Sequence, residues 1–124
     1  MVNFYQYRAP AGQYDDAMIA RLWRGCAETP KADGYRRHFS ESVAPSLKAL
    51  DGHRGAWLLS RDVDGRTEFI ALTLWESVAA IESFTGPDIA RSVVEPEARA
   101  VLSGADDVAV HYEVVFPGGP SRRP

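Results

Sequence analysis

Three histidines and one tryptophan are the side chains of this sequence best suited to chemistry. An imidazole titrates near neutral pH, so His38 and His111 are candidate general bases, and His53 is the third histidine. In the stretch LTLWES, Trp75 ends an apolar run and is followed directly by a charged residue and a hydroxyl residue. A tryptophan at the end of a strand either fills the core or faces a small molecule. The sequence therefore offers a base and an aromatic wall as parts of a site.

Each of these candidates also has a purely structural interpretation. Alternation along VAVHYEVV puts Ala109, His111 and Glu113 on one strand face, where the imidazole is either a base or an inert hydrogen-bond partner in an interface. His38 lies beside the apolar stripe of a predicted helix, as a flank residue or a pocket residue. His53 lies in the turn segment DGHRG, where a solvated side chain is the simpler interpretation.

Other kinds of catalytic site find little support in the sequence. His111 and Glu113 have a spacing that suits two metal ligands, but no third ligand is evident. Ser, His and Asp all occur, yet there is no G-x-S-x-G nucleophile elbow, phosphate loop or dinucleotide fingerprint. Cys26 has no activating motif around it. We therefore expect no metal and no cofactor.

Composition limits the classes of protein that remain. A chain of 124 residues has room for one domain with a modest core. The net charge of −3 argues against nucleic acid as a partner, since such proteins normally present a basic face. No apolar run approaches the roughly 18 residues of a membrane helix, so we expect no membrane partner. The start MVNFYQYRAP lacks a signal-peptide pattern and Cys26 has no internal partner, so we expect a cytoplasmic protein.

The first half of the chain contains the elements that would position these residues. MIARLWRG predicts a strand over residues 18–25. Apolar residues at spacings of four and three predict a helix over residues 31–50, with a kink at Pro45. AWLLSRDV and TEFIALTLW predict two strands, and Asp64-Gly65 between them predicts a tight hairpin.

The second half repeats a helix and a strand. Ser77 is the predicted N-cap of a helix that stops at Gly86-Pro87. A second helical stretch is expected to begin near Asp88 and to restart at Pro96, and DVAVHYEVVF predicts the last strand. The resulting order βαββαβ predicts an α+β, ferredoxin-like fold with a four-stranded antiparallel sheet.

The two central strands are apolar on both faces. In residues 69–75, Phe69 and Trp75 lie on one face while Ile70, Leu72 and Leu74 lie on the other. Helices can cover only one face of such a sheet. We therefore predict a homodimer in which a second copy covers the other face.

Four stretches of the sequence carry a family resemblance. They are MIARLWRG, LDGHRGAWLLSR, LTLWES followed by SFTG, and VHYEVV. From Met18 to about Phe116 the sequence resembles the antibiotic biosynthesis monooxygenase (ABM) domain of the dimeric α/β-barrel superfamily. The resemblance implies a domain over residues 18–116 that pairs as a dimeric α/β barrel. Residues 1–17 would be an extension, either a natural arm or a misplaced start, and residues 117–124 a disordered tail.

The family's functional residues match this sequence only in part. Members that oxidise aromatic polyketides without a cofactor have an asparagine, a tryptophan and a tyrosine near this strand end. Trp75 matches the tryptophan, but Ala71 and Ile81 stand at the other two positions. The tryptophan and histidine of the haem-degrading branch correspond to Phe84 and Val94, so the resemblance does not support haem ligation in that manner.

Together these observations predict a pocket between the sheet and the helices, with a small aromatic molecule as its ligand. The expected catalytic residues are His111, Trp75 and His38. The expected substrate-binding residues are Tyr35, Phe39, Phe84, Trp57 and Arg61. The resemblance implies a small cofactor-independent monooxygenase of secondary metabolism acting with O2 on an aromatic, polyketide or quinol-type substrate. A non-redox polyketide cyclase or isomerase, or a non-catalytic ligand-binding dimer, are the alternatives.

Overall fold

The computed structural model describes residues 18–117 of the chain. The predicted N-terminal extension, residues 1–17, lies outside the described residues, and so does the predicted tail apart from Pro117. Within residues 18–117 no helix is long and apolar enough to span a membrane.

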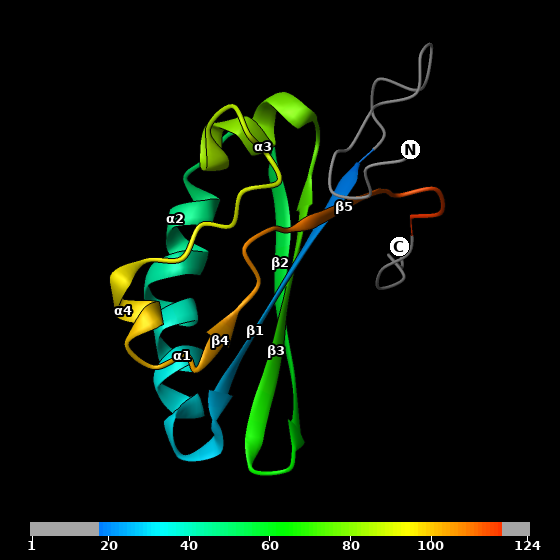
Figure 1. Ribbon diagram of the computed structural model, residues 1–124. Coiled ribbons are helices and arrows are strands. Elements are labelled where there is room, and N and C mark those ends of the chain that lie inside the picture. The colour runs from blue at the N-terminus through cyan, green and yellow to red at the C-terminus, as the bar shows by residue number, and fades with distance from the viewer. Residues whose placement is uncertain (1–17, 118–124) are drawn as a thin grey trace, which may run out of the picture.

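An antiparallel sheet with helices on one side forms the framework (Figure 1). Its long strands are β1 (Ile19–Glu28), β2 (His53–Val63) and β3 (Arg66–Trp75), in the spatial order β2-β3-β1. Two short strands, β4 (Gly104–Ala105) and β5 (Val110–Glu113), both pair with the free edge of β1. This arrangement confirms the predicted ferredoxin-like α+β fold, with the fourth strand divided into two pieces.

The hairpin between β2 and β3 forms where the sequence predicts it. Asp64 and Gly65 have φ angles of 52° and 80°, the left-handed pair that a tight two-residue turn requires. Register then runs without interruption from Val63↔Arg66 to Gly55↔Leu74. Because side chains alternate, this register puts Trp57 and Leu59 on one face and Ala56 and Leu58 on the other.

The first helical segment is continuous but changes its winding. It contains a 3-10 turn (Thr29–Lys31), α1 (Ala32–His38), a π-helical turn (Phe39–Val43) and α2 (Ala44–Lys48). Pro45 has no N–H to donate to the carbonyl four residues earlier, and a wider π turn accommodates this break. The irregularity expected at Pro45 therefore occurs, but in the turn that precedes it.

The next helix, α3 (Val78–Thr85), has the predicted ends. The Ser77 side chain accepts a hydrogen bond from the Ala80 N–H at 3.0 Å, and Gly86 ends the helix with a φ of 85°. The predicted helix start near Asp88 is wrong, since residues 88–95 are irregular and the helical part of this stretch is α4 (Pro96–Arg99). Ser92 N–H instead donates to the Asp107 carbonyl at 3.0 Å and Ala109 N–H to the Ala90 carbonyl at 2.8 Å.

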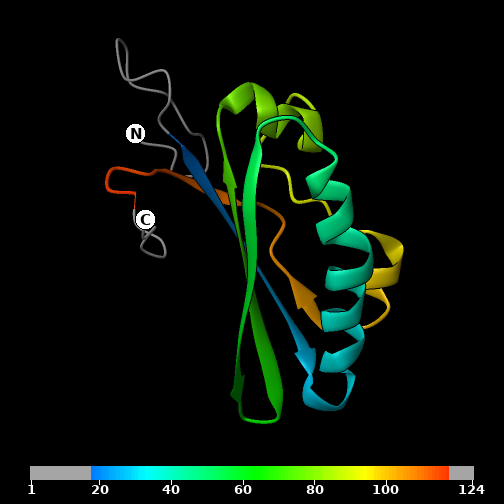
Figure 2. The ribbon, with the colours of Figure 1, turned by 180° about the vertical axis from the view of Figure 1, so that it is seen from behind.

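That pairing also explains why the last strand is shorter than predicted. The backbone of residues 107–109 bonds to the irregular segment that follows α3, so only Val110–Glu113 remain for the edge of β1. The irregular segment is thereby fixed over the helix-covered face of the sheet. The opposite face carries no element of the described chain (Figure 2).

Candidate functional site

Trp75 is a core residue. Its side chain has no solvent exposure, and its indole N–H donates to the Thr73 hydroxyl at 2.9 Å. The ring stacks on Phe84 at a centroid distance of 5.8 Å, and His53 meets it edge-on at 5.1 Å. Phe84, and not Trp75, is among the residues that line the cavity described below. Trp75 therefore supports the cavity wall from behind.

Replacing Trp75 with phenylalanine is expected to lower the free energy of unfolding by about 1 to 2 kcal/mol. The smaller ring leaves a void under Phe84 and removes the N–H that occupies the Thr73 hydroxyl. Chemical denaturation with urea would measure the change. A loss below about 0.5 kcal/mol would contradict the assignment of Trp75 to the core, since a change of that size is typical of a surface substitution.

A small cavity lies between the sheet and the helical layer. Its volume is about 50 Å³, enough for only a few water molecules. Both core clusters and the irregular segment before α4 contribute to its walls. The lining residues are Arg21, Trp23, Tyr35, His38, Phe39, Val43, Leu47, Ala71, Thr73, Phe84, Val93, Val94, Glu95 and Ala98. Four of the residues expected from the sequence, Tyr35, His38, Phe39 and Phe84, thus meet in one place.

His38 is the histidine that reaches this cavity. Its side chain is 10% exposed, and its Nε2 atom lies 3.1 Å from an Oε1 atom of Glu95, although the two are not aligned as a full hydrogen bond. Tyr35 lies beside it with a ring-centroid distance of 6.3 Å, and burial raises the pKa of Tyr35 to about 12. The phenol therefore stays protonated at neutral pH, and the His38 imidazole is the candidate base of the cavity.

Arg21 is a charged residue of the cavity that the sequence reasoning missed. It lies on the inward face of β1, only 4% exposed, between Ile19 and Trp23. Its Nη2 atom donates to the Arg91 carbonyl at 2.9 Å, and its Nη1 atom donates to the Ile89 carbonyl. The signal in the sequence was an arginine at an apolar position of an alternating strand.

His111 lies against Arg21 and outside the cavity lining. Arg21 Nη1 donates to His111 Nε2 at 3.0 Å, so this nitrogen is the acceptor of a neutral imidazole. Burial, and next the charge of Arg21, lower the pKa of His111 to about 4. A base with so low a pKa that does not face the cavity is less suited to proton abstraction than His38. Its catalytic role stays a prediction, and the geometry favours a positioning role.

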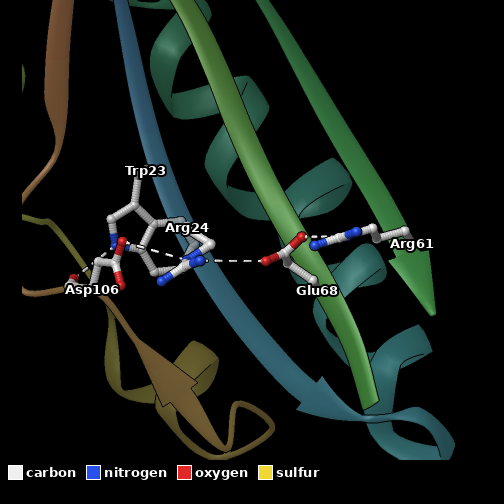
Figure 3. A network of polar contacts seen from close by, with 5 residues as sticks. All are labelled: Trp23, Arg24, Arg61, Glu68 and Asp106. Atoms are coloured by element: carbon white, nitrogen blue, oxygen red, sulfur yellow. Dashed lines mark hydrogen bonds and ion pairs between the residues drawn. The ribbon is translucent and has the colours of Figure 1, made fainter. Parts of the chain in front are cut away.

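Trp57 and Arg61 lie on the opposite face of the sheet from the cavity. Trp57 is 48% exposed there, and Arg61 donates to Glu68 at 2.7 Å. Figure 3 shows Glu68 between Arg61 and Arg24, across the three long strands. These two residues therefore do not line the cavity that contains His38 in one copy of the chain, and their predicted role in substrate binding stays a prediction.

A larger hollow of about 580 Å³ borders this polar network. It is open to solvent, and its arginines and carboxylates pair with one another: Arg24 lies 3.5 Å from Glu68 and 3.7 Å from Asp106. Exposed, mutually neutralised charges of this kind are poor candidates for catalysis. The smaller, buried cavity around His38 is the better candidate site.

The fold and this cavity define a class of protein: a small ferredoxin-like α+β domain with a small cavity between its sheet and its helices. The chain belongs to the antibiotic biosynthesis monooxygenase family, whose sequence profile matches residues 18–96. A comparison with curated proteins gives no match.

Solved structures share the fold at low sequence identity. A Nitrosomonas europaea protein named as an antibiotic biosynthesis monooxygenase is 10% identical, with a TM-score of 0.61, over 86% of this chain and 99% of that chain. The haem degrader MhuD from Mycobacterium tuberculosis, solved with two haems in its active site, is 24% identical, with a TM-score of 0.55. That match covers 82% of this chain and 99% of MhuD.

The cavity of this chain does not offer the ligand expected for haem. Its lining contains one histidine, His38, and the Nε2 atom of His38 lies 3.1 Å from a carboxylate oxygen of Glu95. Val94, at the position where the family resemblance would put a histidine ligand, offers no donor atom. Within residues 18–117 there is also no cluster of three or more metal-ligating side chains. No step of the chemistry proposed below uses haem or a metal.

Proposed function

We propose that this protein is a small monooxygenase that oxidises an electron-rich aromatic or quinol-type substrate with O2 and without a cofactor. The observation that supports the proposal best is the cavity between the sheet and the helices whose lining contains His38, Glu95 and Arg21 together with aromatic rings. A substrate of this class is acidic enough to be deprotonated by an imidazole, and its anion is itself the reductant of O2. The protein then needs a base, a cation and a dry site.

For an anthrone-like substrate the steps balance as follows. His38 takes one proton from the ring CH2 group, and the resulting carbanion reduces O2 to give a peroxide bonded to that carbon. Protonated His38 returns the proton to the peroxide, and then removes the second C–H proton as the O–O bond breaks. The products are a ketone at the former CH2 carbon and one molecule of water, so that one O2 is consumed per substrate.

The cavity must widen to admit such a substrate. Val93, Val94 and Glu95 form one of its walls, and they belong to the irregular segment between α3 and α4. Residues 90–92 of this segment are bonded to residues 107–109, whereas Val93 and Val94 make no backbone hydrogen bond within the described residues, so these two form the part of the wall that moves at the lowest cost. We expect the substrate to enter beneath it.

Oxygen uptake tests the proposed reaction. With anthrone and naphthohydroquinone as substrates, in the presence of a chelator and without added flavin or haem, we expect uptake of one O2 per anthrone oxidised to the ketone. The control is the same assay with protein inactivated by heat. Consumption of a polyketide substrate without O2 uptake would favour the cyclase or isomerase alternative, and binding without turnover would favour a non-catalytic protein.

The second part of the proposal is a homodimer formed through the open face of the sheet. Trp57 is 48%, Leu59 50% and Tyr112 57% exposed on that face. The register puts them beside further half-buried apolar residues of the same face, which are Leu22, Ile70, Leu72, Leu74 and Val110. A continuous apolar surface of this kind is unusual on a monomer and suits a self-complementary interface.

Light scattering coupled to gel filtration is expected to give about twice the chain mass of 13.7 kDa. Leu59→Glu should shift the protein toward the monomer, because it would bury a charge in the interface. Arg37→Glu, on the exposed side of α1, is the matched control and should remain a dimer. A monomeric wild-type protein at micromolar concentration would contradict the proposal.

A further inference from the structure

We propose that Arg21 is the anion-binding group of the cavity and that the ligand is an aromatic molecule bearing a carboxylate. This inference names the substrate class of the site described above and so rests on the proposed function. It starts from an unusual feature: the Arg21 guanidinium is 4% exposed and has no acidic partner among residues 18–117. Within residues 18–117, Arg21 takes part in none of the ion pairs.

A buried cation without a counter-ion is costly, because the guanidinium loses its hydration and gains no opposite charge. Burial, with the neighbouring charge of Arg91, lowers the pKa of Arg21 to about 10, so the group remains charged at neutral pH. Its hydrogen-bond partners are two backbone carbonyls and a neutral imidazole, none of which carries a negative charge. Arrangements that lower stability in this way tend to occur at functional sites.

The contacts of Arg21 fix its orientation and leave donors for a ligand. Nη1 donates to the Ile89 carbonyl and to His111 Nε2, and Nη2 donates once, to the Arg91 carbonyl. The Nε–H and one N–H of Nη2 are not used by any hydrogen bond in the described part of the chain. Two N–H groups on neighbouring nitrogens match the two oxygens of a carboxylate. The Phe84 ring, 5.6 Å below the guanidinium carbon, holds the plane in place.

The rest of the lining selects the kind of anion. Among the described residues of the lining, Arg21 is the one permanent cation. The carboxylate of Glu95 also lines the cavity, beside His38. One positive charge balances a monoanion, whereas a phosphate dianion would keep an unpaired charge and face Glu95. The aromatic rings of Trp23, Tyr35 and Phe39 provide apolar contacts for a flat ring. A carboxylated aromatic ring satisfies both parts of the cavity.

His111 is a positioning residue in this site. Its Nε2 atom accepts one Nη1–H of Arg21. This hydrogen bond fixes the orientation of the guanidinium plane, and that N–H is then not available to the ligand. The register of β1 and β5 places the two residues directly opposite each other, Arg21↔His111. The interaction therefore depends on the pairing of strands and not on a mobile loop.

Calorimetric titration with matched ligands tests the inference without turnover. Benzoate, salicylate and 2-naphthoate are each compared with the corresponding amide, which has the same shape and no charge. The titrations are run under nitrogen, so that a failure of the oxygenase chemistry does not affect them. We expect wild-type protein to bind at least one carboxylate tenfold or more tightly than its amide.

Arg21→Met and Arg21→Lys separate the charge from the fold. Arg21→Met should lose the preference for the carboxylate, and Arg21→Lys should keep part of it, as a point charge without the planar fork. Equal binding of acid and amide by wild-type protein, no binding of either, or a preference that persists in Arg21→Met would each overturn the inference. The wild-type comparison stands even if both variants fail to fold. Oxygen uptake by wild-type protein on neutral naphthohydroquinone, together with equal binding of each acid and its amide, would reject the carboxylate site and leave the proposed function intact.

Discussion

Replacing His38 with glutamine is expected to reduce turnover by about 10² to 10⁴ fold, the usual contribution of a general base. Glutamine keeps a polar group of similar size beside Glu95 but does not accept a proton at neutral pH. His38 is the histidine in the lining of the buried cavity, and its Nε2 atom is 3.1 Å from Glu95. Steady-state oxygen uptake with anthrone measures the effect.

His53→Gln is the matched control for this change. His53 packs edge-on against Trp75 at 5.1 Å and does not line the cavity, so its loss should leave turnover within a few fold. Thermal unfolding of both variants shows whether the fold survives. Turnover in His38→Gln within threefold of wild type would reject His38 as the base, and His111→Gln would then be the variant to assay.

Lowering the pH from about 6.5 to about 4 is expected to destabilise the protein through His111. Burial and the charge of Arg21 lower the pKa of this imidazole from 6.5 to about 4 in the folded state. Between these values the unfolded chain binds the proton and the folded chain does not, so acid favours unfolding. The contribution of His111 is fully present above pH 6.5 and is lost as the pH falls toward 4. Its size is of the order of 3 kcal/mol.

His111→Gln isolates this effect from other titrations. Glutamine has an amide oxygen that can accept the Arg21 Nη1–H, but it does not titrate, so its stability curve should be flatter between pH 6.5 and 4. Burial also lowers the pKa of His53, and this contribution is common to both proteins and cancels in the difference. Melting temperatures across this pH range provide the measurement. Between pH 6.5 and 4 the melting temperature of the wild-type protein should fall by about 10 °C more than that of His111→Gln. Parallel curves for the two proteins would show that His111 does not titrate in this way.

Local sequence signals accounted for most of the fold. Asp64-Gly65 set the hairpin because its φ angles suit few other dipeptides, and Ser77 set a helix start because its hydroxyl caps a free N–H. The order of strands and helices then left few topologies for a sheet with one covered face. These features depend on residues a few positions apart, which is why they can be predicted from the chain alone.

Segment 88–95 shows where local reasoning failed. Its composition suggested a helix near Asp88, but residues 90–92 bond to residues 107–109, which are far away in the sequence. The same contacts shortened the last strand to Val110–Glu113. A backbone hydrogen bond between distant segments has no side-chain pattern that reveals it, so only the tertiary structure could decide between the two conformations.

The site divides in the same way. The sequence by itself identified Tyr35, His38, Phe39 and Phe84, because helical spacing and the family resemblance bring them to one side of the sheet. Only the tertiary structure decided that Trp75 lies behind Phe84, that Trp57 and Arg61 belong to the other face, and that Arg21 replaces His111 at the cavity. Periodicity shows which side chains share a face of a strand, whereas the face that the helices cover, and the depth and partners of each side chain, depend on which elements pack over it. Arg21 was missed for this reason: its charge is held by carbonyls of residues 89 and 91, which no spacing along β1 can indicate.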